Sequence, residues 1–292
     1  MTDFFSKIVA ELAQAQIPCP RLEARELFAF VQHKNTSEIY AGCPISSAEK
    51  EQISALVQKR LVHFPLDKII GRKGFYKNEF ICNEDVLSPR PETEIIVEQA
   101  LSLLPPQVSA NILDLGTGSG CIIESILAEN PQWSGTAVDA SEKALQTARQ
   151  NAASLQLENR LQFIKASWFD TDFLTHFPKK FEIIVTNPPY IPLADIEQLE
   201  PEVKEHDPML ALSGGESGFD SYKRIAELAP TLLHNNGRIL IEAGIGQAQK
   251  IADIFAGHGL LLHKIVTDLA GIERCVILQK RVAQLYHKKN SG

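Results

Sequence analysis

The tetrapeptide Asn187-Pro188-Pro189-Tyr190 is the most chemically specific feature of the chain, and only Thr186 separates it from the apolar run 181–185. It combines one amide side chain, two conformationally restricted residues and one aromatic ring. Proline fixes φ at about −65°, so the neighbouring backbone carbonyls are oriented before any ligand arrives. Asparagine followed by proline also marks ordinary turns. However, the carboxyl ends of strands in open α/β sheets are where ligands bind, which favours a binding site here.

The tetrapeptide suits chemistry on a planar NH2 group. Such a nitrogen is a poor nucleophile because its lone pair is delocalised into the neighbouring π-system. Two acceptors that bind both of its hydrogens can hold it in place while it becomes pyramidal; the Asn187 side-chain oxygen and the Pro188 carbonyl are suitable. Positioning of this kind can contribute about 7–11 kcal/mol, without a strong general base. We therefore predict methyl transfer to a planar NH2 group, with Asn187, Pro188 and Tyr190 as catalytic residues and Asn187, Pro188, Pro189 and Tyr190 holding the substrate.

A glycine-rich loop, DLGTGSG over residues 114–120, follows the apolar run 112–115 and precedes the helical stretch 121–129. Glycine lets the backbone turn sharply and approach a ligand closely, and the N-terminus of the following helix offers unpaired N–H groups. Asp139 ends the next apolar run, where an acid in a doubly wound fold accepts the hydroxyl groups of a ribose. Together these features imply a bound nucleoside.

The glycine spacing indicates which nucleoside this is. A dinucleotide fingerprint has the spacing GxGxxG, whereas this loop has GxGxG, which fits S-adenosylmethionine, a ligand without pyrophosphate. A glycine loop on its own can be a plain turn, but the preceding strand, the following helix and Asp139 together favour the cofactor. The residues expected to bind it are Gly116, Thr117, Gly118, Ser119, Gly120 and Asp139.

The elements that position these motifs alternate from residue 111 onward. Short apolar runs and helical stretches follow one another, which is typical of βαβ units and a parallel sheet covered on both faces. The last two apolar runs, 261–266 and 275–280, are too close in sequence for a helical crossover, so they should pair antiparallel. We therefore predict an α/β fold: the Rossmann-like sheet of class I methyltransferases, with a C-terminal antiparallel hairpin.

The N-terminal part has a different pattern. Residues 1–63 are predicted to be helical, and SSAE at 46–49 fits a capping box that opens a third helix. Residues 64–88 contain proline, glycine and two short aromatic-containing runs, which suggests a hairpin between two domains. We expect a small helical domain over 1–63, a linker with a short β-hairpin over 64–88 and a catalytic domain over 89–286.

Composition and charge exclude several classes of protein. The 292 residues are 44% hydrophobic and 22% charged, which excludes a disordered or collagen-like chain. The net charge of −7 gives no general attraction for nucleic acid. The five cysteines and eight histidines show no metal-ligand spacing, so we expect no metal and reduced thiols in the cytoplasm. We expect no signal peptide, and no apolar run approaches the roughly 20 residues of a membrane span.

The chain resembles the release-factor glutamine methyltransferases, the HemK/PrmC family, over almost its whole length. The NPPY motif alone is shared with adenine-directed and other amino-directed methyltransferases, whereas the PRPETE segment is more particular to this family. The matching stretches are PLDKIIG at 65–71, residues 75–80, SPRPETE at 88–94, ILDLGTGSG at 112–120, residues 138–153, TNPPYI at 186–191, DPMLALSGG at 207–215 and DLAGIER at 268–274.

The resemblance implies a substrate and a division of labour. The substrate would be the glutamine side-chain amide in the Gly-Gly-Gln tripeptide of peptide-chain release factors, whose methylation supports translation termination. The helical domain would recognise the factor, and neither a membrane nor nucleic acid would be a partner. The resemblance also adds Trp168 and Asn187 to the residues that contact S-adenosylmethionine, which would leave as S-adenosylhomocysteine. As a large aromatic residue, Trp168 also suits a plain core position.

The chain departs from the family pattern at three places. Ser167 stands where the family often has aspartate, Lys68 begins a pair that is usually aromatic-led, and Ser88 replaces an apolar residue. Two other polar residues have two interpretations each. Thr93 can line the pocket or cap a helix, and Glu242, at the end of a strand, can face the cleft or form a buried pair.

Two other functions share some of these features. An adenine-directed nucleic acid methyltransferase also uses NPPY, but such enzymes flip a base and usually carry a basic cleft or a target-recognition domain. Here the residues after 75 are net negative. A catalytically silent module that docks on translation factors is the other alternative, and the intact glycine loop, Asp139 and NPPY argue against it.

Overall fold

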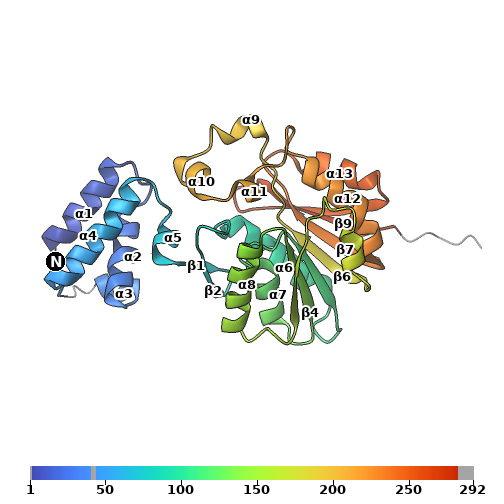
Figure 1. Ribbon diagram of the computed structural model, residues 1–292, viewed down its shortest axis with the longest axis horizontal. Helices are drawn as coiled ribbons and strands as arrows, with labels where there is room; N and C mark the ends of the chain where they lie inside the picture. Colours follow the sequence, from blue (N-terminus) through green and yellow to red (C-terminus); the bar gives the residue numbers. More distant parts are fainter. Residues whose placement is uncertain (1, 41–43, 282–292) are drawn as a thin grey trace, which may run out of the picture.

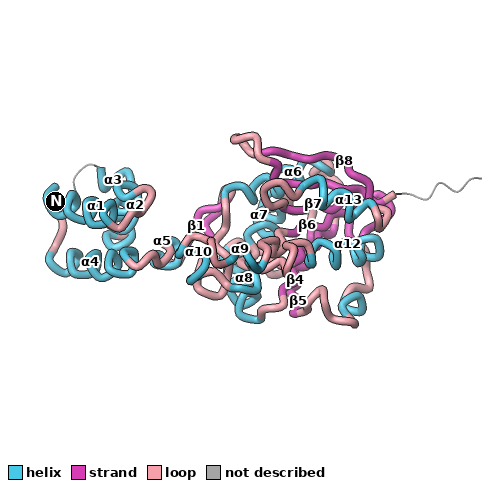
Figure 2. Tube along the Cα trace, turned by 90° about the horizontal axis from the view of Figure 1, so that it is seen from above, coloured by secondary structure: helices cyan, strands magenta, loops and turns pink. Residues whose placement is uncertain are grey.

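The computed structural model describes residues 2–40 and 44–281. A bundle of N-terminal helices, at the left of Figure 1, is joined through a short helix to a larger α/β part, and the view from above in Figure 2 shows the same division. The end of the expected catalytic domain, residues 282–286, lies outside the described residues, as does Cys43. The other four cysteines are free thiols. Within the described ranges no helix is both long enough and apolar enough to cross a lipid bilayer.

The N-terminal bundle has its own hydrophobic core, built from side chains that include Leu12, Phe28 and Val57. The predicted capping box is confirmed, because Ser46 Oγ accepts the Glu49 N–H at 3.2 Å and the Glu49 carboxylate accepts the Ser46 N–H at 2.6 Å. The helix that it opens is the fourth in the structure rather than the third. The helices are α1 (Thr2–Gln14), α2 (Pro20–Gln32), α3 (Thr36–Tyr40) and α4 (Ser47–Leu61).

The connecting segment contains the expected hairpin and one additional helix. Strands β1 (Arg72–Phe75) and β2 (Asn78–Ile81) pair antiparallel. Helix α5 (Leu66–Ile70) precedes them, within the stretch that we expected to be linker. Five residues are too few to show a helical hydrophobic period, so the sequence pattern gave no sign of α5.

The α/β part is built on a seven-stranded sheet of order β5-β4-β3-β6-β7-β9-β8. The first five strands in this order are parallel, and β9 pairs antiparallel with both β7 and β8, which confirms the predicted C-terminal hairpin. The strand order reverses direction between β3 and β6, so the ligand site is expected beside these two strands. The strands are β3 (Asn111–Leu115), β4 (Ser134–Asp139), β5 (Leu161–Lys165), β6 (Phe181–Thr186), β7 (Leu233–Glu242), β8 (Leu260–Thr267) and β9 (Glu273–Lys280).

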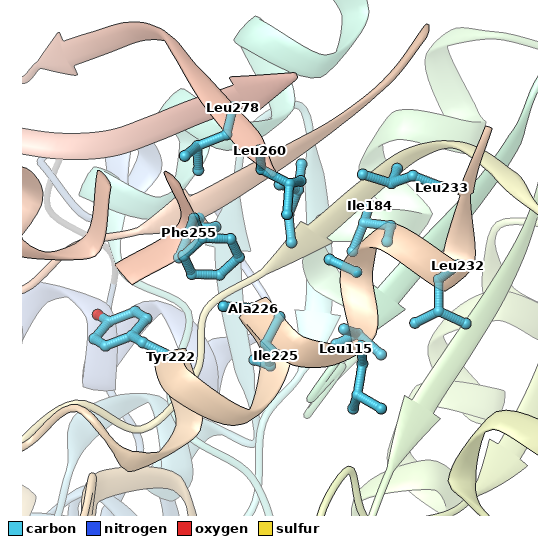
Figure 3. Close-up of a cluster of buried hydrophobic side chains, with 14 of the residues drawn as sticks. Leu115, Ile184, Tyr222, Ile225, Ala226, Leu232, Leu233, Phe255, Leu260 and Leu278 are labelled. Atoms are coloured by element: carbon cyan, nitrogen blue, oxygen red, sulfur yellow. The ribbon is translucent and has the colours of Figure 1, made fainter. Parts of the chain in front are cut away.

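Helices cover both faces of the sheet. The core on one face contains Ile112 and Ile183 together with side chains of α6 (Glu94–Leu103) and α7 (Cys121–Glu129). The core on the other face contains Leu115 and Ile184, which pack with α12 (Asp220–Leu232) and α13 (Ala248–Ala256) as Figure 3 shows. Successive residues of a strand point to opposite faces, so a strand covered on both faces has apolar residues in succession, as Ile183, Ile184 and Val185 of β6 show. The remaining helices are α8 (Glu142–Ser154), α9 (Leu193–Ile196), α10 (Pro201–His206) and α11 (Met209–Leu212), with 3-10 turns η1 (Pro91–Thr93) and η2 (Phe173–His176).

Candidate active site

The motifs singled out from the sequence meet at the carboxyl edge of the sheet. The glycine loop follows β3, Asp139 ends β4, Asn187 follows β6 and Glu242 ends β7. These strands are parallel neighbours in the order β4-β3-β6-β7, so their carboxyl ends lie side by side. Thr186 Oγ donates to the Leu115 carbonyl at 2.7 Å and ties the end of β6 to the end of β3.

The glycine loop has the backbone conformation that its composition indicates. Gly116, Gly118 and Gly120 have φ of 75°, 56° and 84°, a region that residues with a side chain rarely occupy. The Thr117 hydroxyl donates to Asp114 Oδ2 at 2.6 Å, and Asp114 is fully buried. The Thr117 side chain therefore faces the protein interior. Ser119 is also buried, at 2% exposed, so contacts from these two residues to a ligand would come from their backbone.

Asp139 organises the glycine loop. Its Oδ2 accepts the Gly118 N–H at 2.9 Å, and its Oδ1 accepts the Ser141 N–H at 2.8 Å. Burial raises the pKa of Asp139, and these backbone hydrogen bonds oppose that shift. Each carboxylate oxygen has further lone pairs, so both can still accept a hydroxyl group. The geometry is thus compatible with the predicted ribose contact.

Trp168 closes one side of the glycine loop. A Cβ placed on Gly116 would lie 3.2 Å from the indole carbons Cη2 and Cζ3, so the ring packs directly against the loop. Trp168 also packs against the core beneath α12 and α13, and the buried indole Nε1 has no hydrogen-bond partner in the described part of the chain. Both interpretations of Trp168 therefore fit its position. The neighbouring residue Ser167 is one of the departures from the family pattern, and its Oγ accepts the Phe169 N–H at 3.2 Å.

The NPPY motif is held by a segment further along the chain. Gln247 Nε2 donates to the Tyr190 carbonyl at 3.1 Å. A Cβ on Gly214 would lie 2.8 Å from Tyr190 Cα, and one on Gly218 would lie 2.6 Å from the Tyr190 carbonyl oxygen. Only glycine permits this close approach. Burial raises the pKa of Tyr190 to about 12, so its ring stays neutral. Pro188 is buried, and Asn187 and Pro189 are partly buried.

Asn187 is connected to the PRPETE segment and to β7. Its Nδ2 donates to Thr93 Oγ at 3.4 Å, and Thr93 Oγ donates to Glu242 Oε2 at 2.6 Å. Thr93 and Glu242 are 3% and 4% exposed. The Thr93 side chain does not cap α6, and it contacts Asn187 and Glu242 instead.

Glu242 is a buried acid with an altered acidity. Burial raises its pKa to about 7, and the hydrogen bond from Thr93, the charge of Arg274 and a hydrogen bond from Asn187 oppose the rise. Glu92 raises it further through like charge. Sequence reasoning noted Glu242 only as a strand-end acid, and no pattern linked it with Thr93, which lies 149 residues earlier. Gln247 was missed entirely, and its only sequence signal is its position just after β7.

Comparison with known proteins identifies the class of enzyme to which the chain belongs. The sheet and the glycine loop define a class I methyltransferase, and the model of the "Methyltransferase small domain" matches residues 93–199. A ribosomal protein L11 methylase from Lactobacillus delbrueckii subsp. bulgaricus shares this fold with a TM-score of 0.50 at 16% identity, covering 72% of this chain and 90% of that one. A methyltransferase from Pyrococcus furiosus also has a TM-score of 0.50, at 15% identity, covering 80% and 98% of the two chains.

The particular family follows from the curated relatives. The model of the "PrmC N-terminal domain" matches residues 3–71 and so extends through α5. The release factor glutamine methyltransferase of Rhodospirillum rubrum is 37% identical over 93% of this chain and 82% of its own length. That of Caulobacter vibrioides is 38% identical over 91% of both chains. The chain belongs to the release factor glutamine methyltransferase family, and it is an S-adenosylmethionine-dependent methyltransferase.

Proposed function

We propose that this chain transfers a methyl group from S-adenosylmethionine to the side-chain amide nitrogen of the glutamine in the Gly-Gly-Gln motif of peptide-chain release factors, and so supports translation termination. The observation that carries the proposal is the contact between the PRPETE segment and the NPPY motif, made by Thr93 and Asn187 at 3.4 Å. The segment most particular to the family thus lies at the motif that acts on a planar NH2 group.

The residues at the sheet edge fit S-adenosylmethionine. Gly118 has open space where a Cβ would stand, Asp139 has free lone pairs, and the Trp168 indole N–H lacks a partner among the described residues. We expect the loop residues 116–120, Asp139, Trp168 and Asn187 to hold the cofactor. When bound, it supplies an electrophilic methyl group on a sulfonium.

The residues of the NPPY motif would then position the acceptor nitrogen. Asn187 Oδ1 and the Pro188 carbonyl accept the two N–H bonds of the glutamine carboxamide, and the Tyr190 ring stacks on its plane. Orientation and exclusion of water provide the rate enhancement. The methylated nitrogen becomes acidic and loses its proton to water, so no side chain has to act as a strong base.

A crevice between the N-terminal bundle and the α/β part is the proposed docking site for the factor. It has a volume of about 910 Å³, and its lining includes Glu23 and Arg60 from the bundle and Arg90 and Glu202 from the α/β part. In this proposal residues 1–63 recognise the substrate, 64–88 form the linker and 89–286 carry out catalysis.

The test is methyl transfer from labelled S-adenosylmethionine to three acceptors: a purified release factor, DNA and RNA. We expect label on the release factor alone, and loss of label when the Gly-Gly-Gln glutamine is replaced by alanine. Label on adenine in nucleic acid would support the adenine-directed alternative. Cofactor binding without transfer to any acceptor would support a silent docking module.

A further inference from the structure

Two buried polar side chains and the partly buried Asn187 form one directed chain of hydrogen bonds at the NPPY motif. Asn187 donates to Thr93 and Thr93 donates to Glu242, over 3.4 Å and 2.6 Å. Thr93 and Glu242 are almost fully buried. Neither has a role in the chemistry described so far, since the acceptor nitrogen needs no strong base.

The direction of this chain decides which end of the Asn187 amide faces the pocket. A threonine hydroxyl has one hydrogen and two lone pairs. Because the Glu242 carboxylate only accepts, it takes the hydrogen of Thr93 and also accepts from Asn187 directly, and Thr93 Oγ can then only accept from Asn187. The NH2 end of the amide is therefore turned inward, which leaves Oδ1 for the pocket. The orientation of an amide is set by its partners in this way.

We propose that Thr93 and Glu242 are positioning residues that present the oxygen of Asn187, and not its NH2 group, to the substrate carboxamide. The proposal rests on the proposed function, in which this oxygen accepts a substrate N–H. If Glu242 were a donor, the Thr93 hydrogen would be free to bind Asn187 Oδ1. The amide would then turn, and two NH2 groups would face each other across the site.

Charged and titratable groups from several elements surround Glu242 and influence whether it is ionised. The charged and titratable groups near it come from each neighbouring element: Arg274 and Cys275 from β9, Glu92 from η1, Tyr190 after β6 and Tyr222 from α12. Arg274 is the cation of this set, and Asp268 holds it at 2.9 Å. The Tyr222 hydroxyl donates to the Glu242 backbone carbonyl at 2.9 Å, which fixes the backbone.

Protonation of Glu242 provides one test of the proposal. A protonated Glu242 can donate to Thr93, so the wild-type turnover number should fall as the pH drops below about 7, where burial places the pKa of this acid. Glu242→Gln carries an NH2 group that can donate to Thr93 at every pH. Its turnover should therefore be low, and it should not fall further below about pH 7. Arg274→Lys keeps the neighbouring positive charge and serves as the matched control. Its turnover number should still fall below about pH 7, as in wild type.

The second test uses the hydroxyl of Thr93. Thr93→Val keeps the shape and removes the hydroxyl, whereas Thr93→Ser keeps the hydroxyl. With release factor as substrate, we expect Thr93→Val and Glu242→Gln to lower kcat by about 10²-fold, as loss of a positioned acceptor does. The dissociation constant of S-adenosylmethionine should stay within a few fold of wild type, and Thr93→Ser should restore most of kcat. Equal kcat in Thr93→Val and wild type would overturn the proposal.

A measurement without turnover separates this inference from the proposed function. In ¹⁵N-labelled protein, the side-chain NH2 of Asn187 should be protected from hydrogen exchange, and both Thr93→Val and Glu242→Gln should remove the protection. If the protection of the Asn187 NH2 group is the same in both variants as in wild type, the positioning role is refuted. A wild-type protein that shows the protection but never methylates a release factor refutes the proposed function instead and supports the positioning role.

Discussion

The ammonium group of Lys68 lies 2.8 Å from the carboxylate of Asp207, and these two side chains are 0% and 2% exposed. Lys68 belongs to α5, and Asp207 follows α10, the helix beside α5 in both Figure 1 and Figure 2. Lys68 also donates to the His206 carbonyl at 2.6 Å, and Arg90 reaches the other Asp207 oxygen at 3.1 Å. Asp207 precedes Gly214 and Gly218, which pack on Tyr190. The ion pair therefore joins this segment, residues 207–218, to α5, the helix that leads to the N-terminal bundle.

Removal of this ammonium should be costly. Lys68→Met leaves Asp207 buried with Arg90 as its remaining ionic partner, and loss of one member of a buried pair costs about 3–5 kcal/mol. We expect a loss of this size in the free energy of unfolding, measured in urea, together with lower methyl transfer. Lys204→Ala, in the exposed pair between α10 and Glu197, is the control and should cost under about 1 kcal/mol. Equal losses for the two variants would contradict this account of the buried pair.

Asn187→Ala removes the proposed acceptor from the substrate. Turnover should fall by about 10²-fold or more, because the acceptor acts where the nitrogen reacts. Asn187 is partly exposed and its loss opens no large cavity, so the thermal unfolding midpoint should change little. Steady-state transfer to a release factor checks this, and near-normal turnover would remove Asn187 from the catalytic site.

Asp139→Ala should mainly weaken cofactor binding. The substitution removes a proposed ribose acceptor and also frees the N–H groups of Gly118 and Ser141 that hold the loop. Loss of such hydrogen bonds corresponds to an increase of about 10-fold or more in the dissociation constant of S-adenosylmethionine, which calorimetry can measure. Asp85→Ala, at an exposed ion pair with Lys143, should leave the constant unchanged. A wild-type constant in Asp139→Ala would exclude the ribose role.

Glu124 gives the protein a pH-dependent stability. It is fully buried beneath Gly120, and neither of its carboxyl oxygens has a hydrogen-bond partner among the described residues. Burial raises its pKa well above 4.5, and nearby Asp114 adds to the rise. The folded state therefore keeps a proton that the unfolded chain releases, and stability is lost as the pH rises above 4.5 toward the raised pKa.

Glu124→Gln should remove this loss. The free energy of unfolding of wild type should decline from pH 5 to pH 8 more steeply than that of Glu124→Gln, because the amide does not ionise. Urea titrations across this pH range measure the difference. Parallel pH profiles for the two proteins would show that Glu124 does not titrate on unfolding.

The sequence was a good guide where local patterns determine structure. Buried strands such as β3 and β6 are short apolar runs, and the interval between β8 and β9 allowed only an antiparallel hairpin. Helices of four to six residues, such as α5, α10 and α11, were not predicted, because so few residues show no period.

The candidate site was partly predictable for the same reason. The glycine loop, Asp139 and NPPY follow neighbouring parallel strands, so their meeting at one edge could be expected. Whether they bind the cofactor and the glutamine stays a prediction. The pairs Thr93–Glu242 and Lys68–Asp207 join positions 149 and 139 residues apart, and only tertiary folding brings them together.

The most direct test of the central claim is mass spectrometry of a release factor after incubation with the protein and S-adenosylmethionine. We expect a gain of one methylene mass, located by fragmentation on the side chain of the Gly-Gly-Gln glutamine, and no gain with Asn187→Ala. A release factor that stays unmodified under conditions where the cofactor is bound, or a gain on another residue, would contradict the account.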